Sequence, residues 1–127
     1  MQGALLTTGK IIEIHNDIIQ TFGGEQGIRD EATLEYLVYE VNHAKDIFRK
    51  AAIALHSICT SHPFFDGNKR TAFAVAENIL AYMDLCIGAP EDEVVGFMLR
   101  VASYTHNRAS VMSWIKENAK SKAAEPV

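Results

Sequence analysis

Cysteine is scarce in this chain, since only Cys59 and Cys86 occur among 127 residues. Both lie in apolar surroundings, and neither has a second cysteine or a histidine at the spacing of a metal site. A disulfide framework and a zinc site are therefore both disfavoured. We expect two buried thiols that behave as small apolar side chains.

Long apolar runs are missing as well. No uninterrupted stretch approaches the roughly 20 residues that a membrane-spanning helix needs. The N-terminus lacks the basic segment followed by an apolar one that is typical of a signal peptide. We therefore expect a cytoplasmic protein with no membrane partner.

Positive charge is not in excess either, because 12 lysine and arginine residues stand against 16 acidic ones, for a formal net charge of −4. Broad nucleic-acid binding rests on many phosphate contacts from basic side chains, so no direct nucleic-acid partner is expected. A chain of this length that is 48% hydrophobic and 22% charged can bury one ordinary core. We predict one domain over residues 1–119 and a disordered tail over residues 120–127, which lacks an apolar face.

Apolar residues recur at helical spacing along most of the chain, and the one short extended piece is at Cys86-Ile87. The pattern predicts an all-α fold, a single compact bundle of about six helices. Thr7 or Thr8 is a suitable cap for the first helix, Gly23-Gly24 ends it, and Asp30 caps the second. The other predicted helices cover about residues 46–61, 68–84, 91 onward and 109–119.

The most informative segment is the loop between the third and fourth predicted helices, His62-Pro63-Phe64-Phe65-Asp66-Gly67-Asn68-Lys69-Arg70-Thr71-Ala72. Pro63 disfavours helical geometry at His62, and Asp66-Gly67 is a turn dipeptide. Asn68 is a suitable N-cap for the helix that follows. Lys69 and Arg70 then place positive charge at the positive end of that helix, which is unfavourable unless an anion binds there.

These residues have the composition of an anion site with a base and an acid beside it. Turn amides, a helix N-terminus and the cations Lys69 and Arg70 can bind a multiply charged anion such as a nucleotide phosphate. Neutral His62 can accept a proton from a hydroxyl, and Asp66 with bound phosphates can hold Mg²⁺. The segment therefore indicates phosphoryl or nucleotidyl transfer. Taken singly, each residue also has a structural explanation, as a helix cap, a turn residue or a solvent-exposed cation.

The same segment resembles the signature of the Fic/Doc superfamily, histidine-x-phenylalanine-x-acid-glycine/alanine-asparagine-x-arginine. Every fixed position is matched here, by His62, Phe64, Asp66, Gly67, Asn68 and Arg70. The stretch Gly23-Gly24-Glu25-Gln26-Gly27-Ile28-Arg29-Asp30 is similar to the glycine-rich turn near the N-terminus of Doc ("death on curing") toxins. Chain length and helix order fit that branch too, and the resemblance covers nearly all of the chain.

The resemblance implies a role for each matching residue. His62 would be the general base toward a substrate hydroxyl, Asp66 would bind Mg²⁺, and Phe64 would anchor the loop in the core. The phosphate cradle would consist of Gly67, Asn68, Lys69 and Arg70. The implied cosubstrate is ATP with Mg²⁺. The implied partners are a cognate antitoxin and a protein substrate, which for Doc toxins is a translation elongation factor.

Two departures bear on the group that is transferred. Fic proteins that transfer AMP usually have glycine where this chain has Lys69, and a second arginine where it has Phe73. Both differences favour the Doc-type reaction, in which a kinase moves the ATP γ-phosphate to a hydroxyl of the elongation factor and arrests translation. Gly67 agrees with the Fic form, so a Fic-type protein adenylyltransferase is the alternative.

Other features leave further questions open. The segment Ser113-Trp114-Ile115-Lys116-Glu117-Asn118 matches the inhibitory helix of some Fic proteins, but Phe73 replaces the arginine that Glu117 would clamp. His43 lies between the second and third predicted helices, where Fic/Doc proteins carry a flap that docks the protein substrate. His15 has no evident ligand partner at fixed spacing.

A function of a different class also fits an all-helical domain, namely a nonenzymatic binding module or a helix-turn-helix regulator. The acidic balance weighs against DNA recognition, and the intact His62 and Asp66 weigh against a module without activity. Arg29 is either a structural residue or a neighbour of the active site, and the structural role is favoured.

Overall fold

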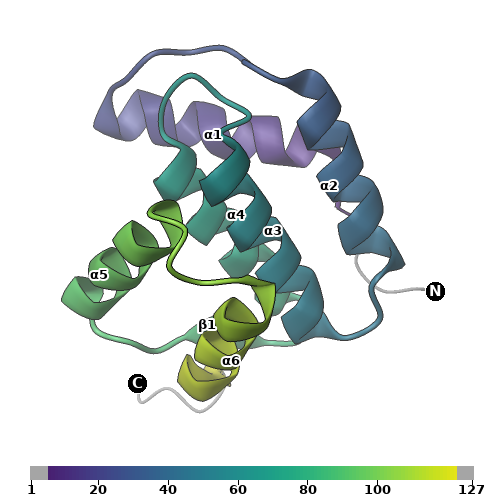
Figure 1. Ribbon diagram of the computed structural model, residues 1–127, viewed down its shortest axis with the longest axis vertical. Helices are drawn as coiled ribbons and strands as arrows, with labels where there is room; N and C mark the ends of the chain where they lie inside the picture. Colours follow the sequence, from purple (N-terminus) through teal and green to yellow (C-terminus); the bar gives the residue numbers. More distant parts are fainter. Residues whose placement is uncertain (1–5, 123–127) are drawn as a thin grey trace.

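The computed structural model describes residues 6–122, which form six helices and two short strands (Figure 1). In chain order these are α1 (Thr8–Phe22), α2 (Glu31–His43), α3 (Ile47–Ser61), α4 (Asn68–Ala81), β1 (Leu85–Ile87), α5 (Glu91–Ala102), α6 (Arg108–Asn118) and β2 (Ala119–Ser121). The predicted all-α fold is confirmed, with the motif loop between α3 and α4. Within the described range, no helix combines the length and apolar character needed to cross a membrane.

Side-chain caps begin α1 and α2 where the sequence places them. Thr7 caps α1 by accepting a hydrogen bond from the Lys10 amide, and Gly23 ends that helix with φ +86°. Asp30 caps α2, where hydrogen bonds from the Thr33 side chain and backbone lower the pKa of its carboxyl. These caps fix the two ends of the glycine-rich connection between α1 and α2.

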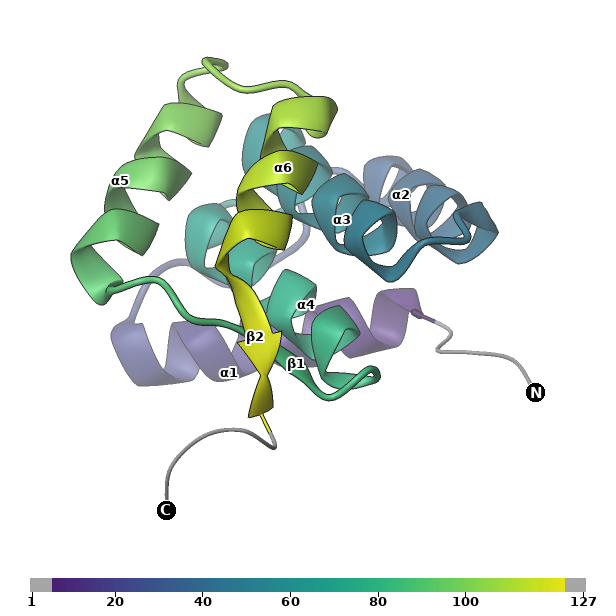
Figure 2. The same ribbon diagram turned by 90° about the horizontal axis from the view of Figure 1, so that it is seen from below.

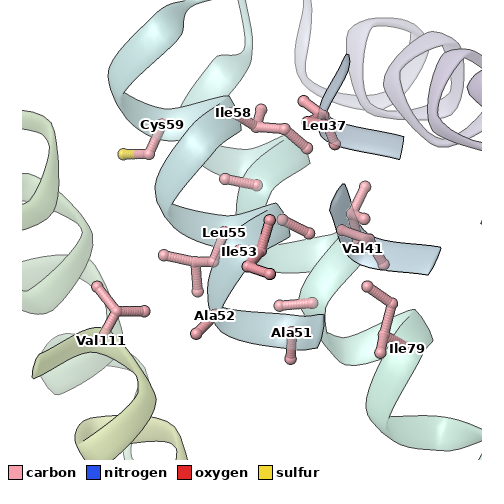
Figure 3. Close-up of a cluster of buried hydrophobic side chains, with 14 of the residues drawn as sticks. Leu37, Val41, Ala51, Ala52, Ile53, Leu55, Ile58, Cys59, Ile79 and Val111 are labelled. Atoms are coloured by element: carbon pink, nitrogen blue, oxygen red, sulfur yellow. The ribbon is translucent and has the colours of Figure 1, made fainter. Parts of the chain in front are cut away.

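Helix α3 is the centre of the core. It packs against α2, α4 and α6, and its buried residues are Ala51, Ala52, Ile53, Ala54, Leu55, Ser57, Ile58 and Cys59. Figure 3 shows Leu37 and Val41 of α2, Ile79 of α4 and Val111 of α6 gathered around this helix. A helix that is apolar on several faces is held by neighbours on each of them. The two helices that carry the motif loop are therefore firmly placed.

The end of the described chain differs from the prediction. Lys120 and Ser121 were predicted to lie in a disordered tail, but β2 pairs antiparallel with β1, with Cys86 opposite Lys120 (Figure 2). The pairing continues where the Lys122 amide donates to the Asp84 carbonyl at 2.9 Å. Backbone hydrogen bonds, which need no alternating apolar pattern, hold this ribbon together. Residues 123–127 of the predicted tail lie outside the described part of the chain.

The two cysteines occupy different surroundings. Cys59 is buried as predicted, and burial raises the pKa of its thiol to about 11. Cys86 lies in β1 and is only half buried, so the prediction of a buried thiol is wrong for this residue. Reaction requires the thiolate, and Cys59 should therefore be inert in the folded protein.

Thr71 of α4 carries an unpaired hydroxyl. The residue is fully buried, and among residues 6–122 its Oγ1 is the buried side-chain polar atom that lacks a hydrogen-bond partner. Thr71→Val should therefore leave the free energy of unfolding unchanged or raise it by up to about 1 kcal/mol, because a buried unpaired hydroxyl is unfavourable. Urea denaturation measures this. Thr60→Val is the control, since that hydroxyl donates to the His56 carbonyl at 2.7 Å and its loss should destabilise. A destabilised Thr71→Val would contradict the expectation.

Candidate functional site

His62 stands where α3 ends, in a left-handed conformation with φ 52° and ψ 62°. This conformation is uncommon for a residue with a side chain, although histidine adopts it more readily than most. The Arg29 guanidinium holds it from outside, donating from Nη2 to the Ser61 carbonyl and from Nε to the His62 carbonyl, each at 2.7 Å. Arg29 thus has a structural role, because it holds the backbone of His62 by hydrogen bonds. The His62 residue itself is exposed.

The glycine-rich connection runs along the motif loop and pairs with it (Figure 1). Ile28 and Phe64 form an antiparallel bridge, and the Phe65 amide donates to the Gly27 carbonyl at 3.3 Å. The Pro63 carbonyl accepts from the amides of Arg29 and Asp30, at 2.7 and 3.0 Å. Phe64 is 1% exposed and anchors the loop in the core, as its place in the signature implies.

The Asp66 carboxylate is held by backbone amides on both of its oxygens. Oδ1 accepts from the Gly67 amide at 3.0 Å, and Oδ2 accepts from the Glu25 amide at 3.1 Å. The side chain nevertheless stays exposed. Gly24 lies against it so closely that a Cβ atom there would meet Asp66 Oδ2 at 2.9 Å. The carboxylate therefore has a fixed direction and free lone pairs.

The sequence predicted that Asn68 caps α4, and this prediction is wrong. The N-cap is Gly67, with φ 76°, and it makes no side-chain cap bond. The Asn68 amide instead turns back into the loop, where Nδ2 donates to the Phe64 carbonyl at 2.9 Å and Oδ1 accepts from the Phe64 amide at 3.1 Å. Because the residue is only 8% exposed and both polar ends of its amide bind Phe64, its side chain closes the loop.

A groove of about 480 Å³ opens beside the start of α4. One end carries the polar residues Asp66, Gly67, Asn68, Lys69 and Arg70, and the rest is walled by apolar side chains, Ile18, Phe22, Phe73, Ala74, Val94, Val95, Met98 and Leu99. The first turn of a helix has amides without intrahelical acceptors, and here two exposed cations stand beside them. The groove thus combines a polar end that carries two cations with an apolar wall.

The structure divides the predicted site residues into two groups. The residues predicted to bind metal and phosphate line one groove, whereas His62, at the other end of the same loop, is not among the lining residues. Arg70 rests against α1, with its guanidinium carbon 4.2 Å from the centre of the Phe22 ring. The contact between Phe22 and Arg70 could not be predicted from the motif, because Phe22 lies in α1, outside that segment.

The donor set fits one hard divalent cation that takes most of its ligands from water and substrate phosphates rather than from the protein. Within residues 6–122, no group of three or more histidine, cysteine, aspartate or glutamate side chains is placed to hold a metal ion. Asp66 supplies a single oriented carboxylate. Mg²⁺ usually keeps several waters and takes one or two carboxylates together with substrate phosphates, so this arrangement suits Mg²⁺ better than a metal that needs a protein cage.

Two other residues of interest lie away from the groove. His43 is bound locally, since its Nδ1 lies 2.9 Å from the Tyr39 carbonyl and its ring lies against the Tyr39 ring, with the centres 4.0 Å apart and the planes tilted by 35°. Glu117 lies on the exposed side of α6 and does not line the groove. These positions give no support to a role of His43 in docking a protein substrate or to an inhibitory role of Glu117.

Known proteins identify the family. The sequence profile of the Fic/DOC family matches residues 5–80, more than half of the chain, and the protein belongs to this family. The chain is also similar to Toxin Doc of Mycolicibacterium smegmatis (strain ATCC 700084 / mc(2)155), with 39% identity over 66 residues. That match covers 46% of this chain and 51% of the relative, so the chain spans about half the length of the curated relative it matches.

Proposed function

We propose that the protein is a Doc-like toxin and an ATP-dependent protein kinase. It transfers the γ-phosphate of ATP to a hydroxyl of a target protein, and the proposed target is a translation elongation factor. The observation that carries the proposal is the arrangement of the motif loop. An oriented Asp66 carboxylate and the cations Lys69 and Arg70 share one groove, while His62 is exposed on the same rigid loop.

The proposed reaction needs little more than these groups. The target hydroxyl oxygen bonds to the γ-phosphorus, the bond from that phosphorus to the β–γ bridging oxygen breaks, and ADP leaves. His62 accepts the hydroxyl proton, and Lys69 and Arg70 offset the charge on the phosphate oxygens. Mg²⁺ held by Asp66 would supply further neutralisation of that charge. Positioning and charge stabilisation account for most of the catalysis in phosphoryl transfer.

The choice of γ-phosphate over AMP rests on two side chains that line the groove. Lys69 stands where AMP-transferring relatives usually have glycine, and Phe73 stands where they carry a second arginine. A bulky cation at position 69 fills space and adds charge beside the start of α4, which favours one orientation of the triphosphate over the other. Gly67 matches the adenylyltransferases, which keeps AMP transfer as the second candidate.

The proposed partners follow from the Doc-like function. A Doc-like toxin requires a cognate antitoxin that restrains it, and the similarity to Toxin Doc of M. smegmatis supports such a partner. A toxin that acts on the translation machinery works in the cytoplasm. Neither a membrane nor a nucleic acid has a part in the proposed reaction.

Labelled ATP separates the candidate functions. The protein is incubated with Mg²⁺, cell extract and ATP labelled at either the α or the γ position, and His62→Ala is treated in parallel. Label transferred only from the γ position supports the kinase, and label from the α position supports the adenylyltransferase. Transfer of neither label by protein shown to be free of a copurified inhibitor would contradict both and leave the binding module.

Lys69→Gly tests the residue that distinguishes the two reactions. Loss of a charged hydrogen bond to phosphate should lower γ-phosphate transfer by about 10- to 100-fold, while the free energy of unfolding changes little because the side chain is exposed. Initial rates at saturating ATP and a urea titration measure the two effects. Lys69→Arg is the matched control, since it keeps the cation. Unchanged γ transfer in Lys69→Gly would show that Lys69 does not set the reaction.

Gly24→Ala tests whether the direction of the Asp66 carboxylate matters. The new Cβ would approach Asp66 Oδ2 to 2.9 Å, so the carboxylate must move. Binding of Mn²⁺ in the presence of ATP should weaken by about tenfold or more, as for other changes that misdirect a metal ligand. Gly23→Ala is the matched control, because Gly23 also has a positive φ, 86° against 126° at Gly24, but a Cβ atom there meets no atom within 4 Å. Equal Mn²⁺ affinity in the two variants would contradict the role of Asp66.

A further inference from the structure

His15 of α1 is buried beneath the motif loop. The residue is only 1% exposed, although histidine is polar, and it lies 51 positions before Asp66 in the sequence. Its ring lies flat on the Phe64 ring, with the centres 3.8 Å apart and the planes within 5°. Its Nε2 lies 2.8 Å from the Asp66 carbonyl oxygen. One side chain therefore touches both the anchor of the loop and its acidic residue.

The hydrogen bond fixes the state of the imidazole. A carbonyl oxygen only accepts, so Nε2 must carry the proton and donate it. That nitrogen is thus not free to bind a metal or to take a proton from a substrate. Through Nε2, His15 therefore acts neither as a metal ligand nor as a base, and the effect of this nitrogen on the site passes through the Asp66 carbonyl that it contacts.

The peptide unit between Asp66 and Gly67 is held from both of its sides. Its carbonyl accepts from His15, and its N–H donates back to Oδ1 of Asp66 at 3.0 Å. Rotation of this unit would break both hydrogen bonds and swing the carboxylate away from the Glu25 amide that holds Oδ2. Ile19, one turn after His15, closes the same side, since a Cβ on Gly67 would lie 3.1 Å from Ile19 Cδ1.

We infer that His15 is a positioning residue for the reaction, because it locks the Asp66–Gly67 peptide and thereby sets the direction of the Asp66 carboxylate and of the first amides of α4. The consequence for transfer rests on the proposed function, whereas the consequence for loop geometry does not. Nothing in the spacing of the sequence indicates this role, since the contact is made to a backbone carbonyl.

Two substitutions separate the hydrogen bond from the packing. His15→Phe keeps a flat ring on Phe64 but has no donor. His15→Gln loses the ring but places an amide N–H about where Nε2 lies. If His15 acts only by filling the core, His15→Gln, which loses the ring, should be the damaging change. If His15 positions the loop through its hydrogen bond, His15→Phe, which loses the donor, should be the damaging change.

The first readout is independent of the chemistry. Hydrogen exchange by NMR follows the amides of Glu25 and Gly67, which both donate to Asp66, with the amides of buried α3 residues as the internal reference. In His15→Phe the two loop amides should exchange about tenfold faster relative to α3, as expected for loss of one hydrogen bond, and His15→Gln should restore them. Equal acceleration of loop and α3 amides, or no change in His15→Phe, would overturn the inference.

The second readout is functional. The dissociation constant for Mn²⁺ in the presence of ATP, and kcat and KM for γ-phosphate transfer, are measured for the same variants. His15→Phe should lose metal affinity and kcat by about tenfold or more, as for other residues that orient a metal ligand, and His15→Gln should recover most of both. Absence of transfer in the unaltered protein would contradict the proposed function, and the exchange experiment would still decide the role of His15.

Discussion

Replacement of His62 by alanine should lower the rate of γ-phosphate transfer by about 10²- to 10⁴-fold, the usual contribution of a positioned general base. The binding of Mn²⁺ with ATP should stay close to that of the unaltered protein, because His62 is not among the residues that line the groove. The expected result is thus a loss of kcat with little change in nucleotide affinity. Single-turnover transfer and equilibrium binding measure the two parts separately.

The backbone at His62 requires a second variant. Its φ of 52° is unfavourable for alanine, so His62→Ala can also lose some stability. His62→Asn avoids this, because asparagine tolerates the left-handed region while lacking a base of suitable pKa. Full transfer activity in His62→Asn would exclude His62 as the base, whatever the behaviour of His62→Ala.

Asn68→Ala should lower the free energy of unfolding by about 2–4 kcal/mol, since each buried polar group left without a partner costs about 1–3 kcal/mol. The substitution strips the Phe64 amide and carbonyl of their two side-chain partners at a buried position. It should also abolish most transfer, because Phe64 lies between His62 and Asp66 on the loop. Thermal and urea unfolding measure the first effect.

A control in the same helix separates this role from general helix effects. Asn78→Ala removes an asparagine from a half-buried position of α4 that has no part in the motif loop, and should cost much less. Asn68→Asp is a second informative change, since it keeps an acceptor for the Phe64 amide but loses the donor to the Phe64 carbonyl. An Asn68→Ala protein as stable as Asn78→Ala would show that these hydrogen bonds contribute nothing.

Much of the fold could be predicted because its signals are local. Thr7, Gly23 and Asp30 act on their own helix ends, and apolar spacing locates the helices between them. The residues of the motif could be found for the same reason, since they are neighbours in the chain. Their common placement on one groove follows from a short loop joined to the first turn of α4.

The parts that could not be predicted depend on contacts to distant backbone. His15 and Arg29 both donate to carbonyl groups of the motif loop, and a carbonyl has the same chemistry at every residue. Asn68 was expected to cap a helix because its side chain suits that role. Its side chain instead makes two buried hydrogen bonds with the backbone amide and carbonyl of Phe64. The extended piece expected at Cys86-Ile87 lies in β1, but β2 and its pairing with β1 were missed because three residue pairs without a buried face leave no periodic pattern.

The pairing of the loop with residues 24–30 has a consequence for how activity arises during folding. The contacts that hold the loop join positions far apart in sequence, such as Arg29 with His62 and His15 with Asp66. These contacts join residues 33 and 51 positions apart, so each requires the intervening chain to close into a large loop at a cost in entropy. A partly folded chain with α3 and α4 already helical would therefore still lack an ordered site. Under the proposed function, transfer activity should therefore be lost together with global unfolding.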